Sequence, residues 1–383
     1  MSSEIGKIFT PDQHNILPQS VHTQGAEKTL SPAVKELEKD GELKETKKEN
    51  VITDHLELGG KTPGADETGE ILISKINKHA PSCEFRTGYD NSFIGPDFKV
   101  PLPEVTGPAK DKVLPVSIYG EKVRNYTHFS VVMNKDRKLA FFTAHNVDGK
   151  TLQSGIKRIG WKIDDTIGDE NQLGNEIYKN NDLDRGHMVR RIAVAWGERG
   201  EAKRASDDSF YYPNAAPQHA RLNQKTWLSL ENWLLENADQ NDNKLCVFTG
   251  PVFRENDKVY RGEKIPADFW KIIILKRKTD GKLAAAGFMM SQKKLLEGIG
   301  NKKHELDKED VETPQIAPYQ VSLSTIEELT SLDFGELKEV DAYSLYRSQK
   351  PKIYRSSAQG PLMQEDIQEI PHNSIHSKED III

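Results

Sequence analysis

The sequence predicts an α+β protein with a central antiparallel or mixed sheet flanked by helices. Three patterns support this class: a short hairpin, two nearly continuous apolar runs and a helix with one apolar stripe. The hairpin comprises 129–133 and 139–143, which are apolar segments separated by the polar turn 135–137. Segments 245–249 and 271–275 are apolar almost throughout. Such runs are typical of buried central strands, so we expect both in the sheet.

The helical stripe consists of Trp227, Leu230 and Leu234, which recur three and four residues apart. Side chains with this spacing lie on one face of a helix, and an apolar face of this kind packs against a core. We therefore expect a helix that covers one face of the sheet.

Further elements follow the same patterns. Segment 283–290 fits a strand or a helix, and its place beside the preceding strand favours a hairpin. Segment 324–332 begins with Ser324, followed by an acid three residues later, which is typical of a capping box and predicts a helix. His128 and His145 flank the first hairpin, and we interpret them as structural or exposed.

The two ends of the chain differ from its middle. Segment 1–82 contains one aromatic residue, Phe9, and is rich in charged residues, so we expect it to be mostly disordered apart from a short helix near Ser31. Segment 350–383 is rich in Ser, Gln, Pro and acids, which predicts a flexible tail. The expected organisation is therefore an N-terminal extension, a catalytic domain over 83–349, and a tail.

The net charge of −6 and the pI near 6.1 are unusual for a protein that binds nucleic acid. The charge is unevenly distributed, however, because 184–225 contains eight Lys and Arg against five Asp and Glu. Such a local excess suits contact with a phosphate backbone without reading bases, although a solvated charged face is the simpler interpretation of any one of these residues.

Two short motifs carry the chemistry of this chain. They are Asp184-Arg185-Gly186-His187-Met188 and Asn214-Ala215-Ala216-Pro217-Gln218, and they are followed by Asn223 and Glu231. They supply a guanidinium, an imidazole, an amide oxygen and a carboxylate. These groups suit hydrolysis of a phosphodiester assisted by one hard metal ion, because the attacking water needs a base and the developing charge needs cations. Taken alone, the first motif also fits a structural turn, and Asn223 also fits a helix N-cap.

The combined motifs resemble the signature of the DNA/RNA non-specific endonucleases, which are the ββα-metal or His-Me finger nucleases. The similarity extends over roughly 85–346. Other segments that follow the family order are 86–90, 248–253, 265–271 and 324–329. The resemblance implies a ββα-metal nuclease fold within the α+β class.

The resemblance also implies a metal site. Asn223 would be the direct ligand of Mg²⁺, with Mn²⁺ as a substitute, because Mg²⁺ keeps most of its water and accepts few protein oxygens. Glu231 would act on that water without touching the metal. His187 would be the general base, and we expect its pKa to be unperturbed, near 6.5.

The remaining site residues have alternatives. Arg185 would clamp phosphate or brace its loop, and we expect its side chain to face the opposite side of a strand from His187. Asn214 would orient substrate or hold a loop. Arg158 lies where the family has a second phosphate-binding arginine, although Lys157 would serve as well.

The function expected from the sequence is non-specific endonuclease action on DNA and RNA that leaves 5′-phosphate and 3′-hydroxyl ends. A narrower phosphodiesterase on the same fold is the first alternative, because fold does not fix substrate. A catalytically inactive nucleic-acid-binding relic is the second.

Partners follow from this function. DNA and RNA are the expected substrates, and a homodimer and an inhibitor or immunity protein stay open. No apolar run suggests a signal peptide or membrane insertion. We therefore expect the chain to be cytoplasmic by default, with leaderless export or delivery into another cell as alternatives.

Overall fold

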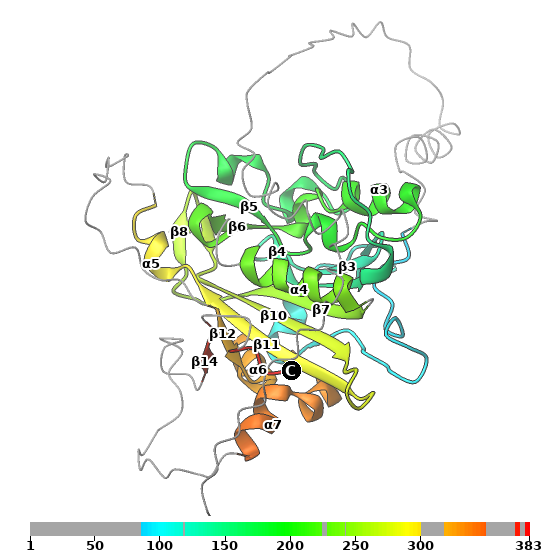
Figure 1. Ribbon diagram of the computed structural model, residues 1–383. Helices are drawn as coiled ribbons and strands as arrows, with labels where there is room; N and C mark the ends of the chain where they lie inside the picture. The colour runs from blue at the N-terminus through cyan, green and yellow to red at the C-terminus, as the bar shows by residue number, and fades with distance from the viewer. Residues whose placement is uncertain are drawn as a thin grey trace, which may run out of the picture.

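The computed structural model describes residues 86–117, 119–223, 228–241, 243–299, 318–349, 372–375 and 380–383. Its centre is an eight-stranded sheet in which every neighbouring pair of strands is antiparallel (Figure 1). In spatial order the strands are β14 (Asn373–Ser374), β12 (Tyr319–Val321), β11 (Leu283–Ser291), β10 (Asp268–Lys276), β7 (Lys244–Val252), β4 (Leu139–Asp148), β3 (Phe129–Asn134) and β2 (Arg124–Tyr126). The predicted α+β class is confirmed.

Smaller sheets and helices surround this sheet. Three strand pairs are β1 (Glu104–Val105) with β13 (Leu332–Asp333), β5 (Leu183–His187) with β6 (Ala215–His219), and β8 (Lys258–Tyr260) with β9 (Glu263–Ile265). The α-helices are α3 (Arg199–Asp208), α4 (Leu228–Asn241), α5 (Lys293–Leu296), α6 (Leu323–Thr330) and α7 (Ala342–Gln349). The 3₁₀ helices are η3 (Gly107–Lys112), η4 (Gly149–Thr151), η5 (Asp169–Asn171), η6 (Asn175–Tyr178), η7 (Arg191–Ala193), η8 (Tyr212–Asn214) and η10 (Gly335–Val340).

The predicted first hairpin is the pair β3 and β4. Its turn is held by Asn134, whose Oδ1 accepts hydrogen bonds from the backbone N–H groups of Asp136 and Arg137. Strand β4 runs to Asp148, five residues beyond the predicted end, because its second half pairs with β7. The ambiguous segment 283–290 is strand β11, which pairs with β10 as the prediction favoured.

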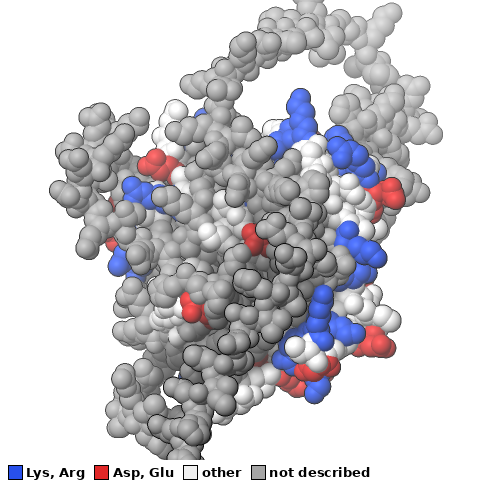
Figure 2. All heavy atoms as spheres, viewed as in Figure 1, with Lys and Arg blue, Asp and Glu red and all other residues white. Residues whose placement is uncertain are grey.

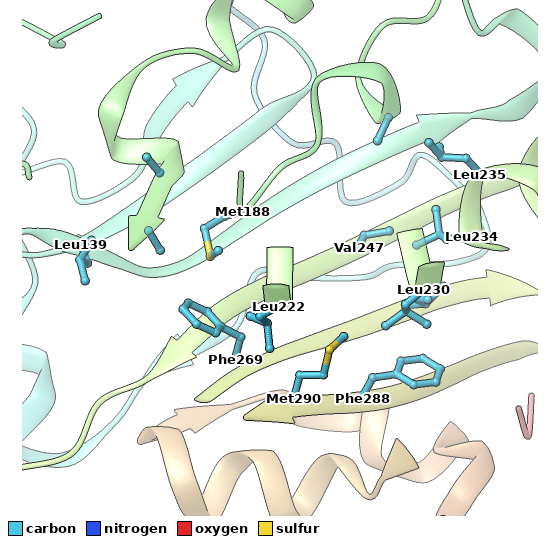
Figure 3. Close-up of a cluster of buried hydrophobic side chains, with 14 of the residues drawn as sticks. Leu139, Met188, Leu222, Leu230, Leu234, Leu235, Val247, Phe269, Phe288 and Met290 are labelled. Carbon is cyan, nitrogen blue, oxygen red and sulfur yellow. The ribbon is translucent and has the colours of Figure 1, made fainter. Parts of the chain in front are cut away.

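Two apolar layers cover the two faces of the sheet. On one face, α4 packs Leu230 and Leu234 against the sheet residues Val247 and Phe288 (Figure 3). Both leucines are buried, so the predicted apolar stripe is confirmed for them, whereas Trp227 lies outside the described residues. The second layer, on the opposite face, includes residues of α6 and η10.

The two strands that carry the candidate site motifs contribute Leu183 and Ala216 to the first apolar layer. Strands β5 and β6 form an antiparallel ladder in which His187 is opposite Ala215, and α4 follows them in the chain (Figure 1). Hairpin and helix together form the expected ββα unit. The connection between the two strands contains η7, α3 and η8, so the two strands are joined by a long segment rather than by a tight turn.

Helix α6 begins at Leu323, whereas the sequence predicted Ser324 as the residue that caps it. Its N-cap is Ser322, whose hydroxyl accepts a hydrogen bond from the backbone N–H of Thr325. The acid at position 327 does not close a capping box, because Glu327 accepts from the backbone of Phe334 instead. The prediction of a helix was right, and the cap at Ser324 was wrong by two residues.

The described part of the C-terminal segment docks on the sheet. Strand β14 pairs with β12, and the side-chain amide of Gln320 exchanges two hydrogen bonds with the backbone of Ile382. Ile381 and Ile383 pack against the first apolar layer. The expected flexible tail over 350–383 therefore does not hold for 372–375 and 380–383. The expected disorder over 1–82 lies outside the described residues.

Candidate active site

Several of the candidate site residues lie on or beside the β5–β6 hairpin. His187 ends β5, Asn214 directly precedes β6, and Asn223 lies between β6 and α4. Gly186 is required by the geometry of the hairpin, because a Cβ atom there would lie 2.1 Å from Oε1 of Gln218. The fold thus brings Asn223 against Asp184, which is 39 residues earlier in the chain.

His187 lies against aromatic rings. Its imidazole centroid is 4.5 Å from that of Trp161 and 5.1 Å from that of Phe210. Its Nε2 atom is shielded from solvent and has no hydrogen-bond partner among the described residues. The ring is therefore fixed in orientation while one nitrogen keeps its capacity to bind a proton or a ligand.

The electrostatic surroundings of His187 favour the neutral imidazole. Burial lowers its pKa well below the usual value, and the positive charges of Arg158, Arg191 and Arg190 lower it further. Both effects disfavour the imidazolium form. The expectation of an unperturbed pKa near 6.5 was therefore wrong, since it ignored the shielding and the arginines.

Arg185 shares a side of the hairpin with His187. Its Nε donates to the Tyr212 hydroxyl at 3.3 Å, and Tyr212 packs on Trp161, the ring that also contacts His187. The expectation of opposite sides was wrong, because the two residues are two positions apart and strand side chains alternate. Arg185 also donates to Asn175 and lies 5.3 Å from the ring centroid of Tyr178. These contacts favour bracing of the hairpin.

Asn214 is completely buried. Its Oδ1 accepts from the backbone N–H of Val189 at 2.8 Å, and its Nδ2 donates to the carbonyls of Val189 and Ser209, each at 2.9 Å. Both the oxygen and the nitrogen of the amide are thus hydrogen-bonded to backbone, and Val189 lies two residues after His187. Of its two expected roles, this geometry favours holding the loop over orienting substrate.

Arg158 lies on a loop fixed by two other arginines. Arg199 donates to the carbonyls of Ser154 and Gly155, each at 3.2 Å, and Arg191 donates to the carbonyl of Ile156 at 3.0 Å. Three successive carbonyls are therefore held. The Arg158 guanidinium lies 5.7 Å from the Phe210 ring centroid, and its charge acts on His187. Among the two expected alternatives, these contacts favour Arg158 over Lys157.

Asn223 offers an oxygen that suits a hard cation. Its Nδ2 donates to Oδ2 of Asp184 at 3.1 Å, so the amide nitrogen is turned toward the hairpin and Oδ1 is the atom available to a metal. Mg²⁺ prefers oxygen ligands and needs few from protein, and an amide oxygen beside a carboxylate fits that requirement. No group of three His, Cys, Asp or Glu side chains that could hold a metal occurs in the described part of the chain.

Glu231 is buried between two cations. Its Oε1 accepts a hydrogen bond from Nζ of Lys271 at 3.2 Å, and its Oε2 lies 3.8 Å from Nε of Arg190. The sequence reasoning missed Lys271, which it treated only as the start of a strand. A lysine within the apolar run Phe269-Trp270-Lys271-Ile272 was the available signal, because buried lysines are almost always paired.

The described residues contain no helix that is long and apolar enough to cross a bilayer. The two histidines that flank the first hairpin, His128 and His145, are both buried rather than exposed. His145 lies on β4, and the charge of Lys271 reaches it.

Comparison with known proteins identifies relatives of this chain. The profile of the DNA/RNA non-specific endonuclease family matches residues 109–341. The uncharacterized protein y4fB of Sinorhizobium fredii (strain NBRC 101917 / NGR234) is 34% identical over 319 residues, which cover 75% of this chain and 47% of that protein. Mitochondrial endonuclease G of Homo sapiens is 30% identical over 129 residues, which cover 30% of this chain and 41% of the relative.

A solved structure of an EndoG/EndoGI complex is also similar. It aligns with a TM-score of 0.44 at 18% identity, covering 61% of this chain and 94% of the other. The chain spans less than half the length of each of these two relatives. The family profile covers more than half of the 383 residues, including the motif residues from Arg158 to Glu231. The chain therefore belongs to the DNA/RNA non-specific endonuclease family.

Proposed function

We propose that this protein is a metal-dependent endonuclease that hydrolyses phosphodiester bonds in both DNA and RNA. The observation that carries the proposal is the state of His187. Its Nε2 is shielded and unpartnered among the described residues, and its pKa is lowered by burial and by three arginines. An imidazole that stays neutral can accept a proton from a water molecule at neutral pH.

The same arginines suit the substrate. Phosphodiesters are anionic, and the exposed Arg158 is the arginine of this group that could contact one, whereas the buried Arg190 and Arg191 only add positive charge beside the base. Guanidinium groups bind phosphate oxygens through two N–H groups at once. Contacts of this kind do not distinguish bases and do not need a 2′-hydroxyl, so they support action on either nucleic acid.

Asn223 would hold Mg²⁺ through Oδ1, with Mn²⁺ as a substitute. When bound, the cation supplies Lewis acidity to the phosphate oxygens. Asp184 holds the Asn223 amide in the orientation that presents Oδ1. Glu231, held between Lys271 and Arg190, would orient water in the site.

In the reaction, His187 takes a proton from water, and the resulting hydroxide attacks phosphorus. The bond from phosphorus to the 3′ oxygen breaks, and that oxygen takes a proton from solvent. The products are a 5′-phosphate and a 3′-hydroxyl. Because water is the nucleophile, no 2′,3′-cyclic phosphate forms.

The test is incubation of plasmid DNA and of RNA with purified protein in Mg²⁺ or in EDTA, with end-labelled substrates to identify the termini. We expect cleavage of both polymers in Mg²⁺. His187→Ala should lower kcat by a factor of about 10² to 10⁴, the usual contribution of a positioned base. His219→Ala, on the second strand of the same hairpin, is the matched control and should retain activity.

Three results would contradict the proposal. Cyclic phosphate ends would exclude attack by water, cleavage of RNA alone would exclude indifference to the sugar, and equal turnover in His187→Ala would remove this base. Activity confined to small phosphodiesters would favour a narrower phosphodiesterase.

A further inference from the structure

Lys271 is a charged residue in the middle of the sheet. It lies on β10 between Trp270 and Ile272, both fully buried, and is itself only 2% exposed. Its Nζ donates to Oε1 of Glu231 and to Oγ1 of Thr249, each at 3.2 Å. Removing an ammonium group from water is costly unless it is paired and hydrogen-bonded, and Lys271 meets both conditions.

The carboxylate that it contacts has each oxygen beside a different cation. Oε1 of Glu231 accepts from Lys271, and Oε2 lies 3.8 Å from Nε of Arg190. Arg190 is fixed in turn, because its Nη1 donates to Oδ1 of Asn232 at 2.8 Å. Arg190 follows His187 by three residues, and its charge acts on that imidazole. Contacts thus link the sheet through Lys271 and Glu231 to Arg190, whose charge acts on His187.

The charge of Lys271 also reaches a histidine of the sheet, His145. His145 is buried on β4, and burial together with the Lys271 charge lowers its pKa well below the usual value. A buried ion pair rarely adds stability over an apolar pair of similar size, so stability alone is a weak reason for this arrangement.

We propose that Lys271 is a positioning residue, which fixes Oε1 of Glu231, the carboxylate that would orient water in the candidate site. The inference rests on the proposed function. It assigns a role to a residue on strand β10 of the central sheet. Lys271 does not touch substrate or metal in this role. It acts through Glu231.

The test uses Mn²⁺ alone as the probe, with binding to the full-length protein measured by titration calorimetry and electron paramagnetic resonance. The variants are Lys271→Met, Glu231→Gln and the double variant. Loss of an outer partner of a metal site commonly weakens metal binding by about 10- to 100-fold. We expect Lys271→Met to weaken Mn²⁺ binding within that range, Glu231→Gln to do the same, and the double variant to be no weaker than Glu231→Gln.

The direction of the change separates positioning from simple charge. If Lys271 only added positive charge near the metal, its removal would reduce repulsion and tighten Mn²⁺ binding. Unchanged or tighter binding in Lys271→Met therefore overturns the inference, and so does a double variant with additive losses. In the cleavage assay, kcat should fall while KM for the nucleic acid stays near the wild-type value.

Two further variants guard against a folding defect. Lys138→Met removes a Lys–Glu pair of 2.7 Å with Glu263, outside this cluster, and should bind Mn²⁺ like the wild type. Thr249→Val removes the second acceptor of Lys271 without changing any charge, and it should weaken Mn²⁺ binding in the same direction as Lys271→Met. If Lys271→Met fails to fold, wild-type affinity in Thr249→Val overturns the inference.

The outcomes also separate this inference from the proposed function. A wild-type protein that neither binds Mn²⁺ nor cleaves nucleic acid contradicts the proposed function, and this inference with it. A wild-type protein that does both, while Lys271→Met keeps wild-type affinity, contradicts this inference alone.

Discussion

The amide of Asn223 is oriented by Asp184, through a hydrogen bond of 3.1 Å from Nδ2 to Oδ2. The contact ties the segment before α4 to strand β5, at the residue directly before Arg185 and Gly186. An amide held at its nitrogen presents its oxygen in a fixed direction. The metal site proposed above therefore depends on both residues.

The first prediction concerns this pair. Asn223→Ala should raise the Mg²⁺ concentration needed for half-maximal cleavage and also lower the maximal rate, because it removes the proposed ligand. Asp184→Ala should raise the Mg²⁺ concentration needed for half-maximal cleavage by about 10- to 100-fold, because the Asn223 amide is no longer held in its orientation. Activity is measured against Mg²⁺ concentration for each variant.

The matched control is Asp182→Ala. Asp182 is exposed and lies in the same segment, so its loss changes the local charge equally without touching the Asn223 amide. A wild-type curve for Asn223→Ala would show that the ligand assignment is wrong. Equal effects of Asp182→Ala and Asp184→Ala would show that net charge, rather than orientation, governs the metal.

The second prediction concerns pH. Because the pKa of His187 is lowered by burial and by Arg158, the acid limb of kcat/KM should lie below pH 6.5 in the wild type. Arg158→Ala removes a cation, so the imidazolium becomes less unfavourable and the limb should move to higher pH. The salt dependence of binding should also fall, by about one unit of slope for a lost phosphate contact.

Lys157→Ala is the control for this prediction. Lys157 is the exposed neighbour of Arg158 and was the alternative phosphate contact expected from the sequence. If Lys157→Ala moves the acid limb and the salt slope while Arg158→Ala leaves them unchanged, the assignment must be reversed.

The central strands could be predicted from the sequence because apolar runs signal their own burial. The runs that became β3, β4, β7 and β10 are patterns visible in one segment at a time. The two short motifs on β5 and beside β6 could also be recognised in the sequence, because their residue types match one kind of chemistry. Local pattern therefore sufficed to predict these strands, whereas the roles of the motif residues stay predictions.

What the sequence could not predict depends on contacts between distant segments. Lys271 meets Glu231 across 40 residues, and nothing local to either residue indicates the partner. The depressed pKa of His187 likewise comes from arginines that only the fold places near it. The docking of Ile381 and Ile383 on the apolar layer is of the same kind, because a tripeptide carries no periodicity.

The third prediction concerns that docking. Deleting residues 380–383 removes two partly buried isoleucines and leaves the buried amide of Gln320 without its Ile382 partner. An unsatisfied buried polar group costs about 1 to 3 kcal/mol, so the free energy of unfolding should fall by at least that amount. Urea unfolding measures it.

The control for the tail is a mutant cycle with Gln320→Leu, which removes the amide that the tail satisfies. The deletion should cost less stability in the Gln320→Leu background than in the wild type, because no amide is left unpaired there. Equal costs in both backgrounds would show that the two hydrogen bonds contribute nothing.

The last prediction concerns stability at acid pH and rests on His145. It is 2% exposed, its Nδ1 has no hydrogen-bond partner among the described residues, and its pKa is well below the usual value because of burial and Lys271. The unfolded chain has a histidine pKa near 6.5, so unfolding takes up a proton below that pH. Stability from neutral His145 is thus present above pH 6.5 and is lost as pH falls toward the folded-state pKa.

In His145→Leu, the free energy of unfolding should fall less steeply below pH 6.5, by up to about 1.4 kcal/mol per pH unit. At pH 8 the difference from the wild type should not vary with pH, since the imidazole is neutral in both states. Chemical denaturation between pH 5 and 8 decides this, and parallel curves for the two proteins would show that His145 takes up its proton without unfolding.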